Sequence, residues 1–168
     1  EATDELASLV NQAMASYQQA SEALEEHLQA KAAAGELVKK IARFGKKWQD
    51  IETQVKKSER GDLDKRVAEL KARQEATSDE GVRSEYERAL SALREQLTYL
   101  DEIEKGRQRA IARLHHQVAT LDRLRLAAVR HRSVGASKLG EELKTVVDEL
   151  NQAGQDLDTA AELAELPG

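Results

Sequence analysis

The sequence of 168 residues contains no cysteine and one proline, Pro167, and only 3% of its residues are aromatic. The absence of cysteine excludes disulfides, thiolate nucleophiles and cysteine metal sites. No hydrophobic run approaches the roughly 20 residues that cross a bilayer, so no transmembrane helix is predicted. The chain also starts without a basic segment followed by an apolar one, so no signal peptide is predicted. We therefore expect a cytoplasmic location, and the chain ends at Glu1 and Gly168 suggest a piece of a longer protein.

The residues that are abundant are those of long helices. Charged residues make up 34% of the chain, the mean hydropathy is -0.66, and Ala, Leu, Glu, Lys, Arg and Gln dominate. Apolar residues recur in alternating steps of three and four, an average of 3.5 that is typical of coiled coils. This spacing is present over residues 6–28, 34–55, 82–121 and 139–164.

The spacing predicts four helices, over residues 3–58, 62–76, 79–132 and 137–165. The first two apolar runs are out of register across residues 31–35, where we expect a local change in supercoil winding and a close approach of another backbone. Gly61 suits the C-terminal end of the first helix and Asp62 the N-cap of the second, while Ser78 suits the N-cap of the third. Arg107 occupies an apolar position of the repeat beside Gly106, so we expect a kink or a loosened layer there.

Net charge alternates along the chain in five blocks. Residues 1–38, 39–73, 74–105, 106–132 and 133–168 carry -6, +6, -5, +6 and -6. If the chain folds back near residues 59–81, the first block can face the fourth, the second can face the third, and the last can return along the fourth. Charges beside an apolar seam select partner and orientation in this way.

These patterns predict an all-α protein, built as one elongated domain over residues 1–168. We expect an antiparallel helical hairpin or coiled coil, with the C-terminal helix packing back to give a three-helix bundle segment. The interpretation needs one true chain reversal, which we place at residues 58–62, with a kink at 77–81. A spectrin-like relay of three-helix segments is the alternative, although no internal repeat favours it.

No catalytic or cofactor motif accompanies this pattern. The Glu-x-x-His motif of helical di-metal sites does not occur, and Gly45-Lys46-Lys47 lacks the spacing and the hydroxyl of a phosphate-binding loop. His27 and His115 flank the seam and could meet as a metal or pH-sensing contact, although no third ligand is evident and packed or solvated histidines are the simpler interpretation. We therefore expect no metal, no cofactor and no enzymatic activity.

Several residues are candidates for contact with partners. Phe44 and Trp48 either anchor packing or form a docking site if no part of the chain covers them. Basic side chains that could contact phosphates are Arg107, Arg109, Arg113, Arg123 and Arg130. Because the chain is net acidic and each basic block has an acidic block to neutralise it, nucleic acid and membranes are unlikely partners.

One tripeptide spells a known adhesion motif. Arg60-Gly61-Asp62 resembles the integrin-binding sequence of extracellular adhesion proteins, but helix caps explain Gly61 and Asp62 equally well.

We therefore expect a non-enzymatic structural or protein–protein interaction module, a coiled-coil spacer or assembly domain of a larger protein. Alanine-rich seams bury little area, so a second copy could complete the core as a homodimer, with Trp48 and residues 31–35 at its interface. The alternative is a helical rod that binds polyanions, a membrane surface or nucleic acid, through the basic blocks 39–73 and 106–132.

Overall fold

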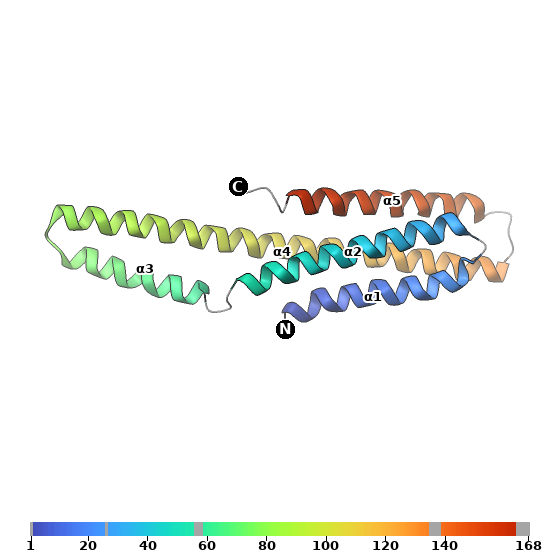
Figure 1. Ribbon diagram of the computed structural model, residues 1–168, viewed down its shortest axis with the longest axis horizontal. Helices are drawn as coiled ribbons and strands as arrows, with labels where there is room; N and C mark the ends of the chain where they lie inside the picture. The colour runs from blue at the N-terminus through green and yellow to red at the C-terminus, as the bar shows by residue number, and fades with distance from the viewer. Residues whose placement is uncertain (1, 26, 56–58, 135–138, 164–168) are drawn as a thin grey trace. The chain divides into compact units, whose positions relative to one another are not determined.

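The computed structural model describes residues 2–25, 27–55, 59–134 and 139–163, and helix is the only regular secondary structure in these ranges. Five helices follow one another there: α1 (Ala2–Ala23), α2 (Leu28–Gln54), α3 (Glu59–Ala76), α4 (Glu80–Val134) and α5 (Leu139–Leu163) (Figure 1). The predicted all-α class is therefore confirmed. The chain forms two compact units, which we name the bundle unit (residues 1–51 and 109–168) and the hairpin unit (residues 52–108).

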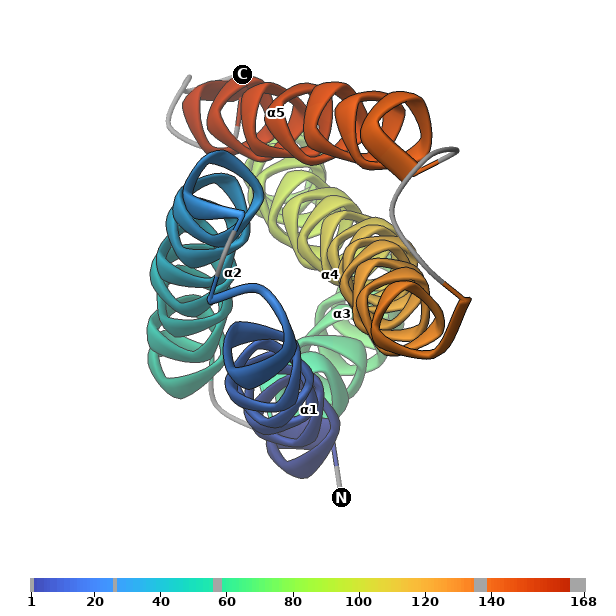
Figure 2. The ribbon, with the colours of Figure 1, turned by 90° about the vertical axis from the view of Figure 1, so that its right-hand side faces the viewer.

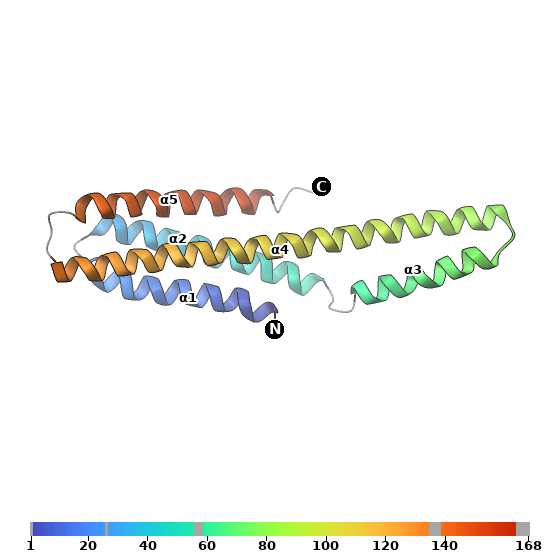
Figure 3. The same ribbon diagram turned by 180° about the vertical axis from the view of Figure 1, so that it is seen from behind.

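The bundle unit contains four packed helices, α1, α2, the part of α4 after Gln108, and α5. Viewed nearly along the helices, they occupy the corners of a quadrilateral in which α1 and α5 are diagonal (Figure 2). α1 and α4 run in one direction, whereas α2 and α5 run in the other (Figures 1 and 3). The largest side chains with almost no exposure in this core are Leu6, Leu9, Leu24, Leu37, Ile41, Leu114, Leu121, Leu124, Leu150 and Leu157.

The prediction of a single helix over residues 3–58 is wrong, because the chain reverses between α1 and α2. The amide of His27 donates to the carbonyl of Leu24 at 2.9 Å, and the amide of Lys31 donates to that of His27 at 3.0 Å. Leu24 is fully buried, whereas Leu28, one helical turn later in the expected repeat, is 74% exposed. Burial of both apolar runs in one core thus overrides the helix propensity of the segment, and the bundle gains a fourth helix.

Glycine allows α1 and α2 to approach each other closely. A Cβ atom at Gly45 would lie 2.6 Å from Cγ2 of Val10, and one at Gly35 would lie 3.1 Å from the hydroxyl of Tyr17. Small residues near 31–35 therefore permit a close approach, as expected, but the neighbour at Gly35 is α1 of the same chain. The register change between the two runs reflects a chain reversal and not a change in winding.

In the hairpin unit, α3 packs antiparallel to the first part of α4 (Figure 3). Arg60 Nη1 donates to Asp101 Oδ1 at 2.5 Å, and Gln74 Nε2 donates to Glu87 Oε2 at 2.9 Å. The chain therefore reverses fully across residues 77–79, where only a kink was expected.

The N-caps and breaks in this unit also differ from the predicted ones. Asp79, not Ser78, caps α4, since its Oδ1 accepts hydrogen bonds from the amides of Gly81 and Val82 at 2.9 and 3.2 Å. Gly61 and Asp62 lie within α3, so Gly61 ends no helix and Asp62 is not its N-cap. Part of the expected reversal at 58–62, and the expected turn at 135–137, lie outside the described residues.

Candidate interaction surfaces

The two large aromatic side chains belong to the core of the bundle unit. Phe44 and Trp48 are 4% and 7% exposed and pack in the same cluster as Ile41. The chain itself covers them, so they anchor packing and do not form an exposed docking site. Trp48 therefore has little exposed surface with which to contact a second copy.

Three of the five candidate arginines form ion pairs with acidic side chains distant in sequence. Arg107 pairs with Glu52, and both side chains are mostly buried. The pairing explains why α4 continues through this apolar position, where a kink or loosened layer was expected: the carboxylate neutralises the guanidinium.

Two ion pairs of the bundle unit match the predicted charge blocks, whereas the pair of Lys40 joins the second block to the last, which was not predicted. Arg123 Nη1 lies 2.8 Å from Glu149 Oε2, and Arg130 Nη1 lies 3.7 Å from Glu142 Oε1, which joins the fourth block to the last. Lys40 Nζ lies 2.6 Å from Asp158 Oδ2 and joins α2 to α5 as well.

Arg109 and Arg113, the remaining two candidates, lie on α4 with exposed side chains. In the hairpin unit, the pair of Arg60 with Asp101 joins the second block to the third, as the charge pattern predicts. Because Arg60 makes this pair from inside α3, the Arg60-Gly61-Asp62 tripeptide is helical and not a loop.

The two seam histidines do not meet. His27 precedes α2, whereas His115 Nε2 lies 3.7 Å from Glu5 Oε1 near the start of α1. The reversal after α1 therefore places the histidines at opposite ends of that helix. Within the described ranges, no group of three or more histidine, aspartate or glutamate side chains could hold a metal ion.

A different surface stands out on the outer side of α1. Residues 6–21 contain no charged residue, in a chain of which 34% is charged. The exposed positions of this stretch include Asn11, Met14 and Gln18, and Met14 is 52% exposed. Residues three and four apart share a face of a helix, so these three side chains form one uncharged stripe.

A hollow of about 490 Å³ lies beside this stripe, between α1 and α2. A Cβ atom at Gly35 would lie 3.1 Å from the hydroxyl of Tyr17, so the glycine leaves room for this side chain beside the hollow. The residues that line the hollow are Met14, Tyr17, Gln18, Ser21, Glu22, Gly35, Val38 and Lys39. Methionine and tyrosine are enriched and charges depleted at the centres of protein interfaces, and a thioether adapts to irregular partners.

The two ends of this surface carry opposite charges. Because Gly45 lies beside Val10 and Gly35 beside Tyr17, the exposed Arg43 and Lys46 of α2 lie toward the start of α1. The exposed Glu22 lies toward the end of α1.

The centre of this surface carries a neutral pair. The Lys39 ammonium donates to Glu36 at 2.7 Å, and this hydrogen bond holds the pKa of the Glu36 carboxyl below its usual value. We name the whole surface the α1–α2 face and define it by Asn11, Met14, Gln18, Glu22, Glu36, Lys39, Arg43 and Lys46.

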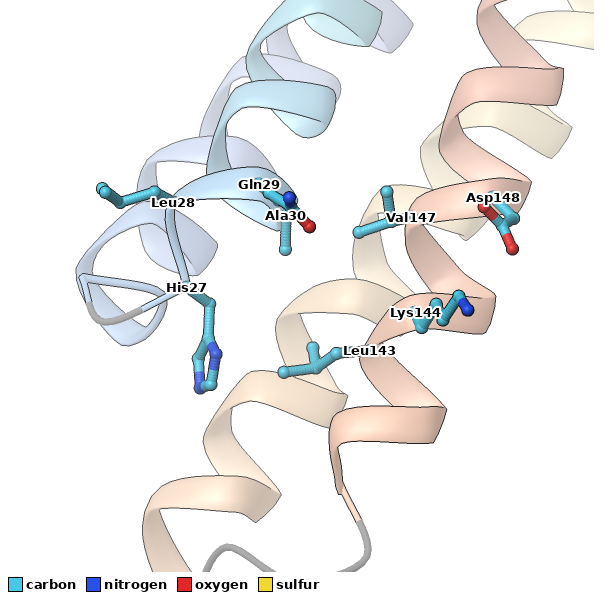
Figure 4. A pocket seen from close by; sticks show the side chains of 8 residues that line it. All are labelled: His27, Leu28, Gln29, Ala30, Leu143, Lys144, Val147 and Asp148. Atoms are coloured by element: carbon cyan, nitrogen blue, oxygen red, sulfur yellow. The ribbon is translucent and has the colours of Figure 1, made fainter.

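A second hollow, of about 570 Å³, opens where α2 and α5 begin (Figure 4). Leu143 and Val147 of α5 point toward the first turn of α2, whereas Leu28 points away from α5. Its remaining lining residues are His27, Gln29, Ala30, Lys144 and Asp148. Apolar side chains thus form much of its walls.

Comparison with protein-family models, curated proteins and solved structures found no match. None of the described helices combines the length and the apolarity that crossing a membrane requires.

The spacing of apolar residues does not indicate the α1–α2 face, because the apolar positions turn inward. The signal that marks the face is the uncharged run of residues 6–21, which is visible in the sequence. Its significance depends on knowing that α2 folds back along α1 and leaves a hollow at Gly35.

Proposed function

We propose that this chain is a structural protein–protein interaction module, an assembly or spacer domain, and that the α1–α2 face contacts its protein partner. The observation that carries the proposal is an exposed stripe without charge beside a hollow lined by Met14, Tyr17 and Val38. Removing the uncharged stripe of Asn11, Met14 and Gln18 from water costs less than removing a charged one, because none of these three side chains is an ion that would lose its hydration.

The rest of the bundle unit is suited to present this face. Its core is continuous, and the Lys40–Asp158 and Arg123–Glu149 pairs connect α5 to both neighbouring helices. A surface fixed on packed helices keeps its geometry better than one built on loops. Partner binding would then require little rearrangement of the module.

The alternative, a polyanion-binding rod that uses the blocks 39–73 and 106–132, has weaker support. Several bases of these blocks already face carboxylates, among them Lys40, Arg60, Arg107, Arg123 and Arg130. Each phosphate contact by such a base would have to replace an existing pair.

Site-specific photo-cross-linking in the native host tests the proposed function. A photoreactive phenylalanine analogue is placed at Gln18 on the α1–α2 face or, as a matched control, at Gln155, an exposed glutamine of α5. We expect a discrete protein adduct from position 18 and none from position 155. Excess unmodified chain should compete the adduct away, whereas excess Met14→Glu chain should not. Equal labelling at both positions, or no adduct at either, would contradict the proposal.

A further inference from the structure

We infer that the occupant of the α1–α2 face is a second copy of this chain, in a twofold-symmetric dimer. The inference rests on the proposed function and names the partner of the same surface.

The shape of the α1–α2 face is suited to contact with an identical face. In a twofold contact the same patch serves both copies, so a projection and the hollow that receives it must lie on one face. Met14 is 52% exposed, and it is one of the residues that line the hollow of about 490 Å³ on this face. An axis through this region lets Met14 of each copy enter the hollow of the other, against Tyr17 and above Gly35.

The distribution of charge on the α1–α2 face also allows contact between two copies. Identical surfaces that carry one sign repel each other, but the middle of this face is uncharged apart from the paired Lys39 and Glu36. A twofold axis that lies in the contact plane and runs across the helices reverses the long direction of the face. The acidic end at Glu22 then lies toward the basic end of the second copy, with its Arg43 and Lys46. Because of the twofold symmetry, this contact between the acidic end of one copy and the basic end of the other occurs twice in the dimer.

The area of the α1–α2 face indicates how strongly two copies would bind each other. α1 has 22 residues. At 1.5 Å per residue and about 10 Å per helix, two adjacent helices of this length present roughly 33 by 20 Å. Two copies would thus bury about 1,300 Å² in total, near the low end of specific interfaces. We expect a reversible dimer with a dissociation constant of about micromolar order.

Sedimentation equilibrium of the purified chain over a wide concentration range tests the inference. The mass should rise with concentration from 18.6 kDa toward twice that value. Met14→Glu should raise the dissociation constant at least about tenfold, since it places a charge at the centre of the contact. Leu126→Glu is the matched control: Leu126 is also apolar and exposed, at 57%, but lies on α4, and dimerisation should be unchanged.

Charge reversal separates a specific contact from a loss of folding. Glu22→Arg and Arg43→Glu should each weaken the dimer, because each places like charges opposite one another. The double variant should restore dimerisation, which a folding defect would not do. Circular dichroism should show unchanged helix content in all of these variants.

Three results would overturn the inference: a monomer at every concentration, equal loss of dimer in Met14→Glu and Leu126→Glu, or no recovery in the double variant. A monomeric chain whose position 18 cross-links to a different protein would overturn self-association and leave the proposed function intact. A monomeric chain without any adduct at position 18 would overturn both.

Discussion

Gly45 lies in the middle of α2, where alanine would ordinarily improve a helix by about 1 kcal/mol. Here a Cβ atom would lie 2.6 Å from Cγ2 of Val10, closer than van der Waals contact permits. We predict that Gly45→Ala destabilises the protein by about 1–3 kcal/mol, because α1 must shift to relieve the overlap. The midpoint of urea unfolding measures the change.

Gly61→Ala is the control for this prediction. Gly61 also lies within a helix, but a Cβ atom added there would have no heavy atom within 4 Å, so the substitution meets open space. It should stabilise α3 by about 0.5–1 kcal/mol through lower backbone entropy of the unfolded chain. If both substitutions moved the midpoint in the same direction, close approach at Gly45 would not be what sets its residue type.

Individual residues were predictable where periodicity alone decides their position. Phe44 and Trp48 fall on the apolar repeat, and both are buried. Arg107 also falls on an apolar position of the repeat. Its side chain is mostly buried because it pairs with Glu52, which lies 55 positions away in sequence. Local spacing predicts which side of a helix faces inward, but it carries no information about which charged group arrives there.

At the scale of elements, polar contacts join α3 to α4 in the hairpin unit, beside the buried Leu63, Leu90 and Leu93. A hydrogen bond from Arg60 lowers the pKa of Asp101 below its usual value of 3.8. The hydrogen bond from Gln74, and to a smaller extent the one from Arg94, lowers the pKa of Glu87 below its usual value of 4.5. A carboxylate with a lowered folded-state pKa stabilises the fold above its unfolded pKa, and this contribution is lost as the pH falls through the folded pKa.

We therefore predict that the hairpin unit loses stability as the pH falls below about 4. Amide hydrogen exchange, resolved by residue, should show protection of α3 falling across this range. The Asp101→Asn variant should show a smaller dependence on pH, because it removes one of the two titrating groups. An identical pH dependence in the variant would mean that the Arg60–Asp101 contact contributes nothing to the hairpin.

The turns between elements were the least predictable part of the fold. The sequence that joins α1 to α2 contains neither glycine nor proline, so nothing local separates it from a continuing helix. Its only signal was the change of register between two apolar runs, which a change in winding would explain equally well. Residues 77–79 are typical of a turn, but the sequence does not show whether they make a kink or a full reversal. The hydrogen bond between Gln74 and Glu87 shows that the chain reverses there.

At the scale of the whole chain, the alternation of charge proved more informative than any motif. It predicted that the last helix returns along the fourth block, and the Arg123–Glu149 and Arg130–Glu142 pairs agree. It did not predict that α1 and α4 run in the same direction, because block charges define neighbours and not chain direction. The charge pattern also did not indicate the α1–α2 face, because the stripe on α1 at its centre lies in the uncharged run of residues 6–21.

The same alternation leads to a prediction about polyanions. Because the chain has a net charge of -5 and many of its bases face carboxylates, we expect binding to duplex DNA and to anionic vesicles only at low salt, lost at about 0.15 M. Fluorescence anisotropy with DNA and co-sedimentation with vesicles measure this. Arg113→Gln should weaken the residual binding, whereas Met14→Glu should leave it unchanged. Tight binding that persists at 0.15 M salt would favour the polyanion-binding rod over the protein interaction module, since fixed intramolecular pairs could not then be neutralising the basic blocks.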